Sequence, residues 1–192
     1  MKTNQTQILF KMPIIEEELE HLFFVFDNEK LLKSENFIEL YPSSLDSEIE
    51  KLRKLNDKKI VAYFKNSIYN PEFYKKGIAK LNKHKQNIIK LIDVLKNDSY
   101  KFLEIFPEYT VRLTLFGTDG MYVYENQEII LKTSTQGIFN WGIVKTILHE
   151  VIHIGIEKRA RETKMLQEKK EEIVNEIFDR KIKHLVDNES NN

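Results

Sequence analysis

The sequence predicts an α+β fold that is mainly helical, with a small antiparallel β-meander packed beside one buried helix. Three observations lead to this prediction. Helical spacing of apolar residues dominates the chain before Pro107, alternation typical of strands is confined to residues 109–132, and the helix expected next is apolar around most of its circumference. No linker divides the 192 residues. We therefore expect one domain over 1–192, with a helical part at 1–106, the sheet and two helices at 107–187, and a tail at 188–192.

Several helices are expected in the first part of the chain. One covers Ile14–Phe26, and either serine of the pair at 43–44 could cap another that runs to about Leu55. The segment Ile60–Phe64 fits a short strand or the end of a helix. The tripeptide Asn-Pro-Glu at 70–72 is a stronger signal, because a cap residue precedes proline at the first helical position. It predicts a helix that ends near residues 97–99.

The alternating stretch predicts three strands joined by two turns. In the first strand, odd-numbered residues from Val111 to Leu115 point to one face and their even-numbered neighbours to the other. A turn at 117–120 leads into a strand over Met121–Tyr124, and a turn at 125–127 leads into a strand over Glu128–Lys132. Helices over Asn140–Glu157 and Gln167–Val186 are expected to follow.

Composition narrows the classes of partner and ligand. Lys+Arg and Asp+Glu both number 30, so we expect no nucleic-acid partner and no attraction to acidic membranes. The chain has no cysteine, so nitrogen and oxygen atoms must hold any metal. The three-residue apolar run Ile8–Phe10 is too short for the core of a signal peptide, and no stretch is long enough to span a bilayer. A cytoplasmic protein is therefore expected.

The stretch ILHEVIHIGIE, residues 147–157, contains the spacing His-Glu-x-x-His. His149 and His153 lie four residues apart, so a helix presents both rings on one face, where they can reach one ion. Glu150 lies beside them and could act on a water bound to that ion. On a helical wheel these residues belong to one polar stripe, made of Lys145, Thr146, His149, Glu150, His153 and Glu157. The alternative is a pair of ordinary core histidines, but a buried helix directly after strands favours a metal site.

A catalytic zinc site needs a third protein ligand, which we expect from the last helix. Glu171 lies at the edge of the apolar stripe of that helix and should face inward, whereas Glu172 falls on the opposite face and remains the alternative. Asn175, one turn after Glu171, could donate or accept a hydrogen bond behind a ligating His149.

With the motif at 149–153 followed by Glu171, the chain resembles the zincin metallopeptidases, and among them the gluzincins. The resemblance covers about Tyr109 to His184, and the arrangement is also similar to that of compact bacterial proteins. In gluzincins the ligand glutamate opens a Glu-x-x-x-Asp pattern. Here Asn175 stands in place of the aspartate, so the imidazole that it contacts would be less basic.

The resemblance implies a zincin-like fold and a Zn2+ ion held by His149, His153 and Glu171. It implies hydrolysis of a peptide or protein substrate by a zinc-bound water, with Glu150 as general base. An extended substrate would pair with an edge strand, for which the candidate residues are Gly120, Met121, Tyr122, Val123 and Tyr124.

The resemblance also implies a donor for the oxyanion, and Tyr122, Tyr124 and His184 are candidates. Two other functions stay open. One is a zinc hydrolase that acts on a non-peptide substrate. The other is a non-catalytic binding or regulatory protein on the same scaffold, against which the retained Glu150 argues, because a structural zinc site needs no base.

Overall fold

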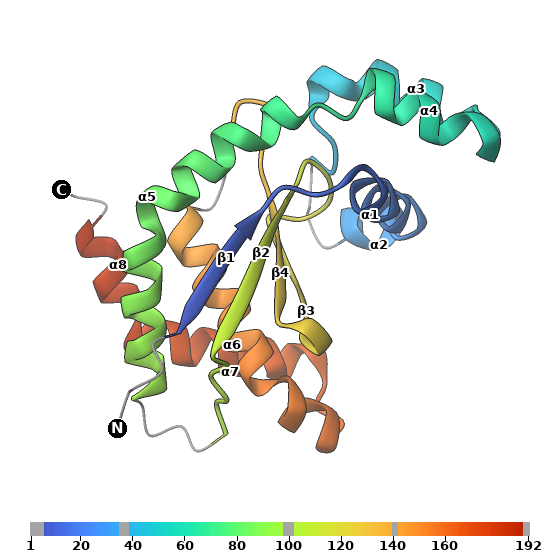
Figure 1. Cartoon of the computed structure of the whole chain (residues 1–192). Coiled ribbons are helices and arrows are strands. Elements are labelled where there is room, and N and C mark those ends of the chain that lie inside the picture. Colours follow the sequence, from blue (N-terminus) through green and yellow to red (C-terminus); the bar gives the residue numbers. More distant parts are fainter. Residues whose placement is uncertain (1–5, 35–38, 98–101, 140–141, 190–192) are drawn as a thin grey trace.

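The computed structural model describes residues 6–34, 39–97, 102–139 and 142–189 (Figure 1). These residues form an α+β fold that is mainly helical, which confirms the predicted class. In chain order the elements are β1 (Gln7–Lys11), α1 (Ile15–Asp27), α2 (Glu29–Ser34), η1 (Ser43–Leu45), α3 (Asp46–Arg53), α4 (Asp57–Ser67), α5 (Pro71–Lys96), β2 (Glu108–Thr114), β3 (Gly120–Val123), η2 (Tyr124–Asn126), β4 (Glu128–Lys132), α6 (Ile143–Glu162), α7 (Gln167–Lys181) and α8 (Lys183–Glu189).

The sheet differs from the predicted antiparallel meander. In the described part of the chain it has four strands in the order β1-β2-β4-β3, and only the β3–β4 pair is antiparallel. β2 runs parallel to β4, with Thr110 beside Glu128 and Thr114 beside Lys132. The prediction was wrong on this pairing because alternation shows which face a residue occupies but not which strand lies next to it. The chain leaves β2, reaches the far edge as β3, and returns between them as β4.

The first strand, β1, was missed by the sequence analysis. It pairs in parallel with β2, and the backbone N–H of Gln7 donates to the carbonyl of Pro107 over 2.8 Å. Parallel neighbours need a long crossover, and here the helices α1 to α5 supply it. The segment 1–106 is therefore not purely helical, because it contributes one edge of the sheet.

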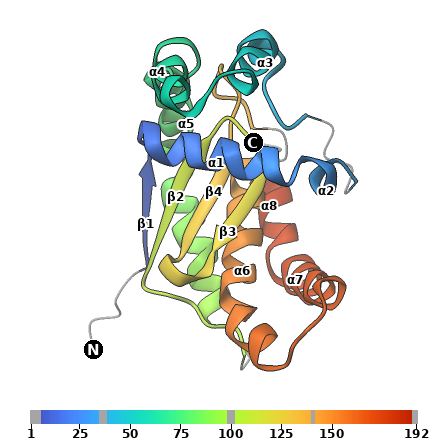
Figure 2. The same cartoon turned by 90° about the vertical axis from the view of Figure 1, so that its right-hand side faces the viewer.

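Helices cover the two faces of the sheet unequally. α5 and α6 pack on one face, and α7 packs on α6 next to the β3 edge of the sheet (Figures 1 and 2). α1 crosses the opposite face (Figure 2). The backbone N–H of Leu115 donates to the buried Glu18 carboxylate of α1 over 2.8 Å, and His21 Nε2 lies 3.2 Å from the carbonyl oxygen of Phe116. α1 is thus fixed to the chain segment that leads from β2 to β3.

Most of the predicted helices are confirmed. Asn70 caps α5 by accepting a hydrogen bond from the backbone N–H of Glu72, as the tripeptide at 70–72 predicted. The ambiguous segment Ile60–Phe64 is helical and lies inside α4. The serine pair at 43–44 does not cap α3, whose cap position is Leu45, because a short 3-10 turn intervenes.

The C-terminal helices differ in their bounds. The single helix expected over Gln167–Val186 is broken at Ile182 into α7 and α8. α6 extends five residues past the predicted end at Glu157, and its predicted start at Asn140 lies outside the described residues. Buried apolar residues of α6, including Ile147, Val151 and Ile154, join one hydrophobic core with residues of the sheet and of both halves of the chain. Among the described helices, none combines the length and apolar character needed to cross a membrane.

Candidate metal centre

Two imidazoles face each other on α6. The Nε2 atoms of His149 and His153 lie 3.1 Å apart, as expected for histidines separated by one helical turn. His153 is almost fully buried, whereas the side chain of His149 is 26% exposed and faces a cavity. The polar stripe predicted from the wheel is therefore real, and most of it is buried against the sheet and α7.

A carboxylate from α7 completes a group of three possible metal donors. Glu171 Oε2 lies 3.3 Å from His153 Nε2 and 3.7 Å from His149 Nε2. Hydrogen bonds with His149 and then His153 lower the pKa of Glu171 below its usual range. Glu172, the alternative ligand, is exposed and instead pairs with Lys169 over 2.6 Å. The structure thus brings Glu171, not Glu172, to the two histidines.

The orientation of Glu171 is fixed by a residue that the sequence analysis missed. Gln167 Nε2 donates to Glu171 Oε1 over 2.6 Å, which leaves Oε2 directed at the imidazoles. Gln167 precedes Glu171 by four residues on the same helix, so the spacing could have indicated it.

Glu150 is buried between α6 and β3, and its carboxylate lines the same cavity. Burial raises the pKa of Glu150, against the lowering effect of the neighbouring histidines. Among the described residues no hydrogen bond to the Glu150 carboxylate is found, and its charged neighbours include His153, His149 and Glu171. A Cβ atom on Gly120 would lie only 2.7 Å from Glu150 Oε1, so this carboxyl group lies directly against the first residue of β3.

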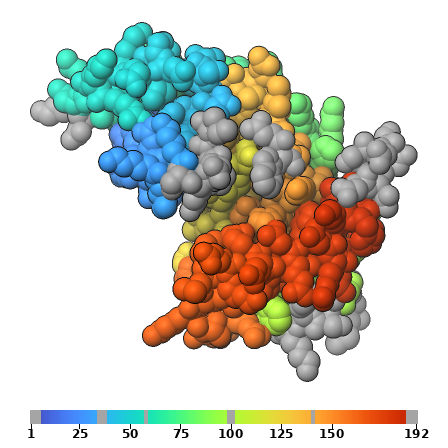
Figure 3. Space-filling view, turned by 180° about the vertical axis from the view of Figure 1, so that it is seen from behind, coloured from blue at the N-terminus to red at the C-terminus, as the bar shows by residue number. Residues whose placement is uncertain are grey.

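The cavity has a volume of about 590 Å³ and lies between the edge strand, α6 and α7. Figure 3 shows the N-terminal helices in blue and α7 in orange and red on either side of a strip of the sheet and α6. The residues that line the cavity are Leu32, Thr118, Asp119, Gly120, Met121, Tyr122, Lys145, Thr146, His149, Glu150, His153, Gln167, Glu171 and Asn175.

The predicted edge strand is at an edge of the sheet. Among the strands that the structure describes, β3 pairs only with β4, so no described strand lies along its other side. Gly120, Met121 and Tyr122 line the cavity. Val123 ends the strand and does not line the cavity. Tyr124 belongs to η2, where its ring lies 5.0 Å from the guanidinium of Arg161.

The remaining predicted site residues lie at varying distances from the donor group. Asn175 lines the cavity, but no hydrogen bond joins it to His149. His153 Nδ1 is buried and has no hydrogen-bond partner among the described residues. His184, a candidate donor for the oxyanion, is exposed on α8 and does not line the cavity. The two histidines outside α6 and α8 do not line the cavity: His21 is buried on α1 and His84 is exposed on α5.

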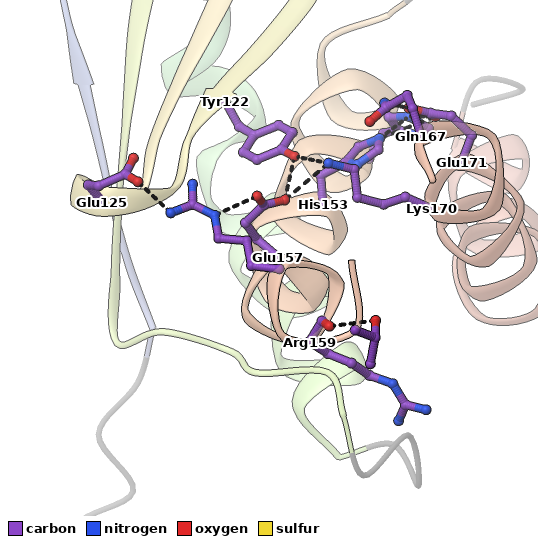
Figure 4. Close-up of polar contacts among 11 residues, drawn as sticks. Tyr122, Glu125, His153, Glu157, Arg159, Gln167, Lys170 and Glu171 are labelled. Atoms are coloured by element: carbon purple, nitrogen blue, oxygen red, sulfur yellow. Dashed lines mark hydrogen bonds and ion pairs between the residues drawn. The ribbon is translucent and has the colours of Figure 1, made fainter. Parts of the chain in front are cut away.

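A polar network lies beside the donor group (Figure 4). Burial raises the pKa of Glu157, but hydrogen bonds from Arg161, Tyr122 and Lys170 more than offset this and lower the pKa to about 2. Burial and the neighbouring Glu157 raise the pKa of Tyr122, so its hydroxyl stays protonated. Arg161 extends the network to the exposed Glu125 over 2.7 Å.

Comparison with known proteins gives no relative. No family model, no curated protein and no solved structure matches this chain.

Proposed function

We propose that the protein is a zinc-dependent metallopeptidase, with His149, His153 and Glu171 as the zinc ligands and Glu150 as the general base. The observation that carries the proposal is the convergence of three donor atoms next to a buried carboxylate that lines a cavity. The resemblance to the gluzincins, which rests on the same four residues, points to the same chemistry.

The donor atoms fit zinc in type and spacing. Zinc accepts imidazole nitrogen and carboxylate oxygen at about 2.0–2.2 Å in a tetrahedral arrangement, which requires donors roughly 3.4 Å apart. The three separations here are 3.1, 3.3 and 3.7 Å. Three protein ligands leave one coordination position open, as is typical of catalytic rather than structural zinc sites.

Bound zinc supplies Lewis-acid chemistry, which makes water a stronger acid near neutral pH and polarises a carbonyl oxygen. Glu150 accepts a proton from the attacking water on its carboxylate and delivers it to the nitrogen of the leaving amine. Burial raises the pKa of the Glu150 carboxyl, which makes its carboxylate a stronger base toward the proton of the water.

The open edge of β3 favours a peptide over other hydrolysable substrates. An extended peptide can add to an open strand through backbone hydrogen bonds, and its scissile bond would then lie in the cavity beside Glu150. Tyr122 is a poor oxyanion donor in this arrangement, because its hydroxyl proton is directed to Glu157 over 2.7 Å.

Two measurements on the purified protein test the proposal. Metal analysis after zinc loading and dialysis should give about one zinc per chain, and a mixed peptide library should be cleaved by the zinc-loaded protein only. Zinc binding with cleavage of ester or amide probes but no peptide would point to a non-peptide substrate. Zinc binding with no hydrolysis of any probe would point to a binding protein, and no zinc binding would end the proposal.

A further inference from the structure

A triangle of hydrogen bonds joins three elements beside the candidate zinc site (Figure 4). Glu157 Oε2 of α6 lies 2.7 Å from the hydroxyl of Tyr122 on β3 and 3.1 Å from Lys170 Nζ on α7. Lys170 Nζ lies 2.7 Å from the same hydroxyl. The helix with two of the zinc ligands, the edge strand and the helix with the third ligand therefore meet at one point.

The direction of each hydrogen bond in the triangle follows from the groups involved. An ammonium group only donates and a carboxylate only accepts. The Tyr122 hydroxyl must therefore accept from Lys170 and donate to Glu157. Within the triangle Lys170 therefore only donates, Glu157 only accepts, and the Tyr122 hydroxyl does both.

The charged members of the triangle are shielded from solvent. The side chains of Lys170 and Glu157 are 12% and 10% exposed, in contrast to the pair Lys169–Glu172 on the same helix, at 62% and 66%. Loss of Glu157 would leave the Lys170 ammonium poorly solvated and without an ion-pair partner among the described residues, which is costly in a buried site, whereas loss of Lys170 would leave Glu157 paired with Arg161 over 2.8 Å. Such an arrangement resists displacement in a way that a surface ion pair does not.

The triangle lies beside two of the proposed zinc ligands, His153 and Glu171. Lys170 precedes Glu171, so fixing Lys170 against β3 and α6 sets the rotation of the first turns of α7 and with it the direction of Glu171. The Tyr122 ring stacks on the His153 ring, with centroids 5.2 Å apart and planes inclined by 12°. Ligating histidines are usually oriented by a hydrogen bond at the second ring nitrogen, but His153 Nδ1 has no such partner among the described residues.

We infer that Tyr122, Glu157 and Lys170 form a positioning triad, which preorganises Glu171 and His153 for the metal without contributing a ligand. The inference rests on the proposed zinc site. The stacked ring of Tyr122 orients the imidazole, and the Glu157–Lys170 pair sets α7. Neither residue of that pair was assigned a role by the sequence analysis, because they lie on different helices and meet only in the folded chain.

The test is the zinc dissociation constant, measured by competition with a chromophoric chelator, for the wild type and matched variants. Lys170→Met and Glu157→Gln should bind zinc about 10- to 100-fold more weakly, although every zinc donor is retained. Lys169→Met is the control, because among the described residues this neighbour forms an ion pair only with the exposed Glu172. The zinc affinity of this variant should equal that of the wild type. Tyr122→Phe keeps the ring and should lose less affinity than Tyr122→Leu, which removes both the ring and the hydroxyl.

The outcomes separate the triad from the zinc site itself. If the wild type binds zinc and the Lys170→Met and Glu157→Gln variants bind it with unchanged affinity, the triad is overturned. The metallopeptidase proposal then still stands. A wild type without zinc affinity would overturn both. A purely structural role predicts a lower melting temperature of the metal-free variants with unchanged zinc affinity, so melting is measured in parallel. If Lys170→Met fails to fold, Tyr122→Phe and Glu157→Gln, which nearly preserve volume, decide the matter.

Discussion

Gly120 lies against Glu150, so that a Cβ atom at position 120 would be 2.7 Å from Glu150 Oε1 and 2.6 Å from Thr146 Cγ2. The edge strand can approach the proposed base this closely only because residue 120 has no side chain. The contact joins the strand proposed to bind the substrate to the carboxylate proposed to accept the proton of the attacking water.

Gly120→Ala should therefore impair catalysis while zinc remains bound. The methyl group must displace Glu150 or the strand, and a displacement of about 1 Å at a reacting group can cost on the order of 100-fold in rate. kcat on a cleaved library peptide, together with zinc content, is the measurement. Val123→Ala, on the same strand but outside the cavity lining, is the control and should keep most of the activity. An unchanged kcat in Gly120→Ala would contradict the proposed closeness of base and substrate strand.

Glu150→Gln should retain one zinc per chain and lose roughly 100- to 10,000-fold in kcat, the range typical of a removed general base. The amide keeps the size of the carboxyl but cannot accept the proton of the attacking water. Full turnover in this variant would remove Glu150 from its role. Glu172→Gln, exposed on α7, serves as the control for loss of one negative charge.

Glu171→Ala should abolish tight zinc binding, whereas Glu172→Ala should preserve it. The first substitution removes a donor 3.3 Å from His153 Nε2, and the second removes only a surface partner of Lys169. Isothermal titration with zinc distinguishes the two, and the reverse result would move the third ligand by one residue.

Glu18 should make the protein less stable as the pH rises. Burial raises its pKa from 4.5 to about 7, so the folded state holds a proton that the unfolded state releases between these values. The contribution of Glu18 to the free energy of unfolding therefore falls by roughly 3 kcal/mol from pH 4.5 to 7. Below pH 4.5 and above pH 7 this contribution does not change with pH. In Glu18→Gln this decrease is absent, so the stability of the variant minus that of the wild type should increase over this range. Urea unfolding at a series of pH values measures it.

His21 should have the opposite effect. Burial lowers its pKa from 6.5 to about 4, so the unfolded state takes up a proton that the folded state does not. Its contribution to stability increases from pH 4 to 6.5 by roughly 3 kcal/mol. The two groups on α1 thus nearly cancel between pH 4.5 and 6.5. The stability of His21→Gln minus that of the wild type should therefore fall from pH 4 to 6.5. A difference that does not depend on pH would contradict a lowered pKa of His21 in the folded chain.

Local spacing along the sequence determined much of the candidate site and of the helical fold. The positions of His149, Glu150 and His153 on one face follow from the period of a helix. This period is a local property of the backbone and does not depend on what packs around the helix. The same period predicted that Glu171 faces inward, although Glu172 remained an alternative third ligand. The start of α5 at Pro71, directly after its cap residue Asn70, could be predicted for a similar reason, since a cap acts within one turn.

Only the tertiary structure decided how the elements meet. The parallel pairing of β2 with β4, the addition of β1, and the approach of Gly120 to Glu150 depend on contacts between residues far apart in the chain. So does the junction of Glu157 with Lys170. Periodicity states which face of an element is buried, but which other element covers that face is set by packing of the whole core. The chemistry of the site could thus be proposed from spacing along two helices, whereas Glu157 and Lys170 could be connected to the site only when α6, α7 and β3 were assembled.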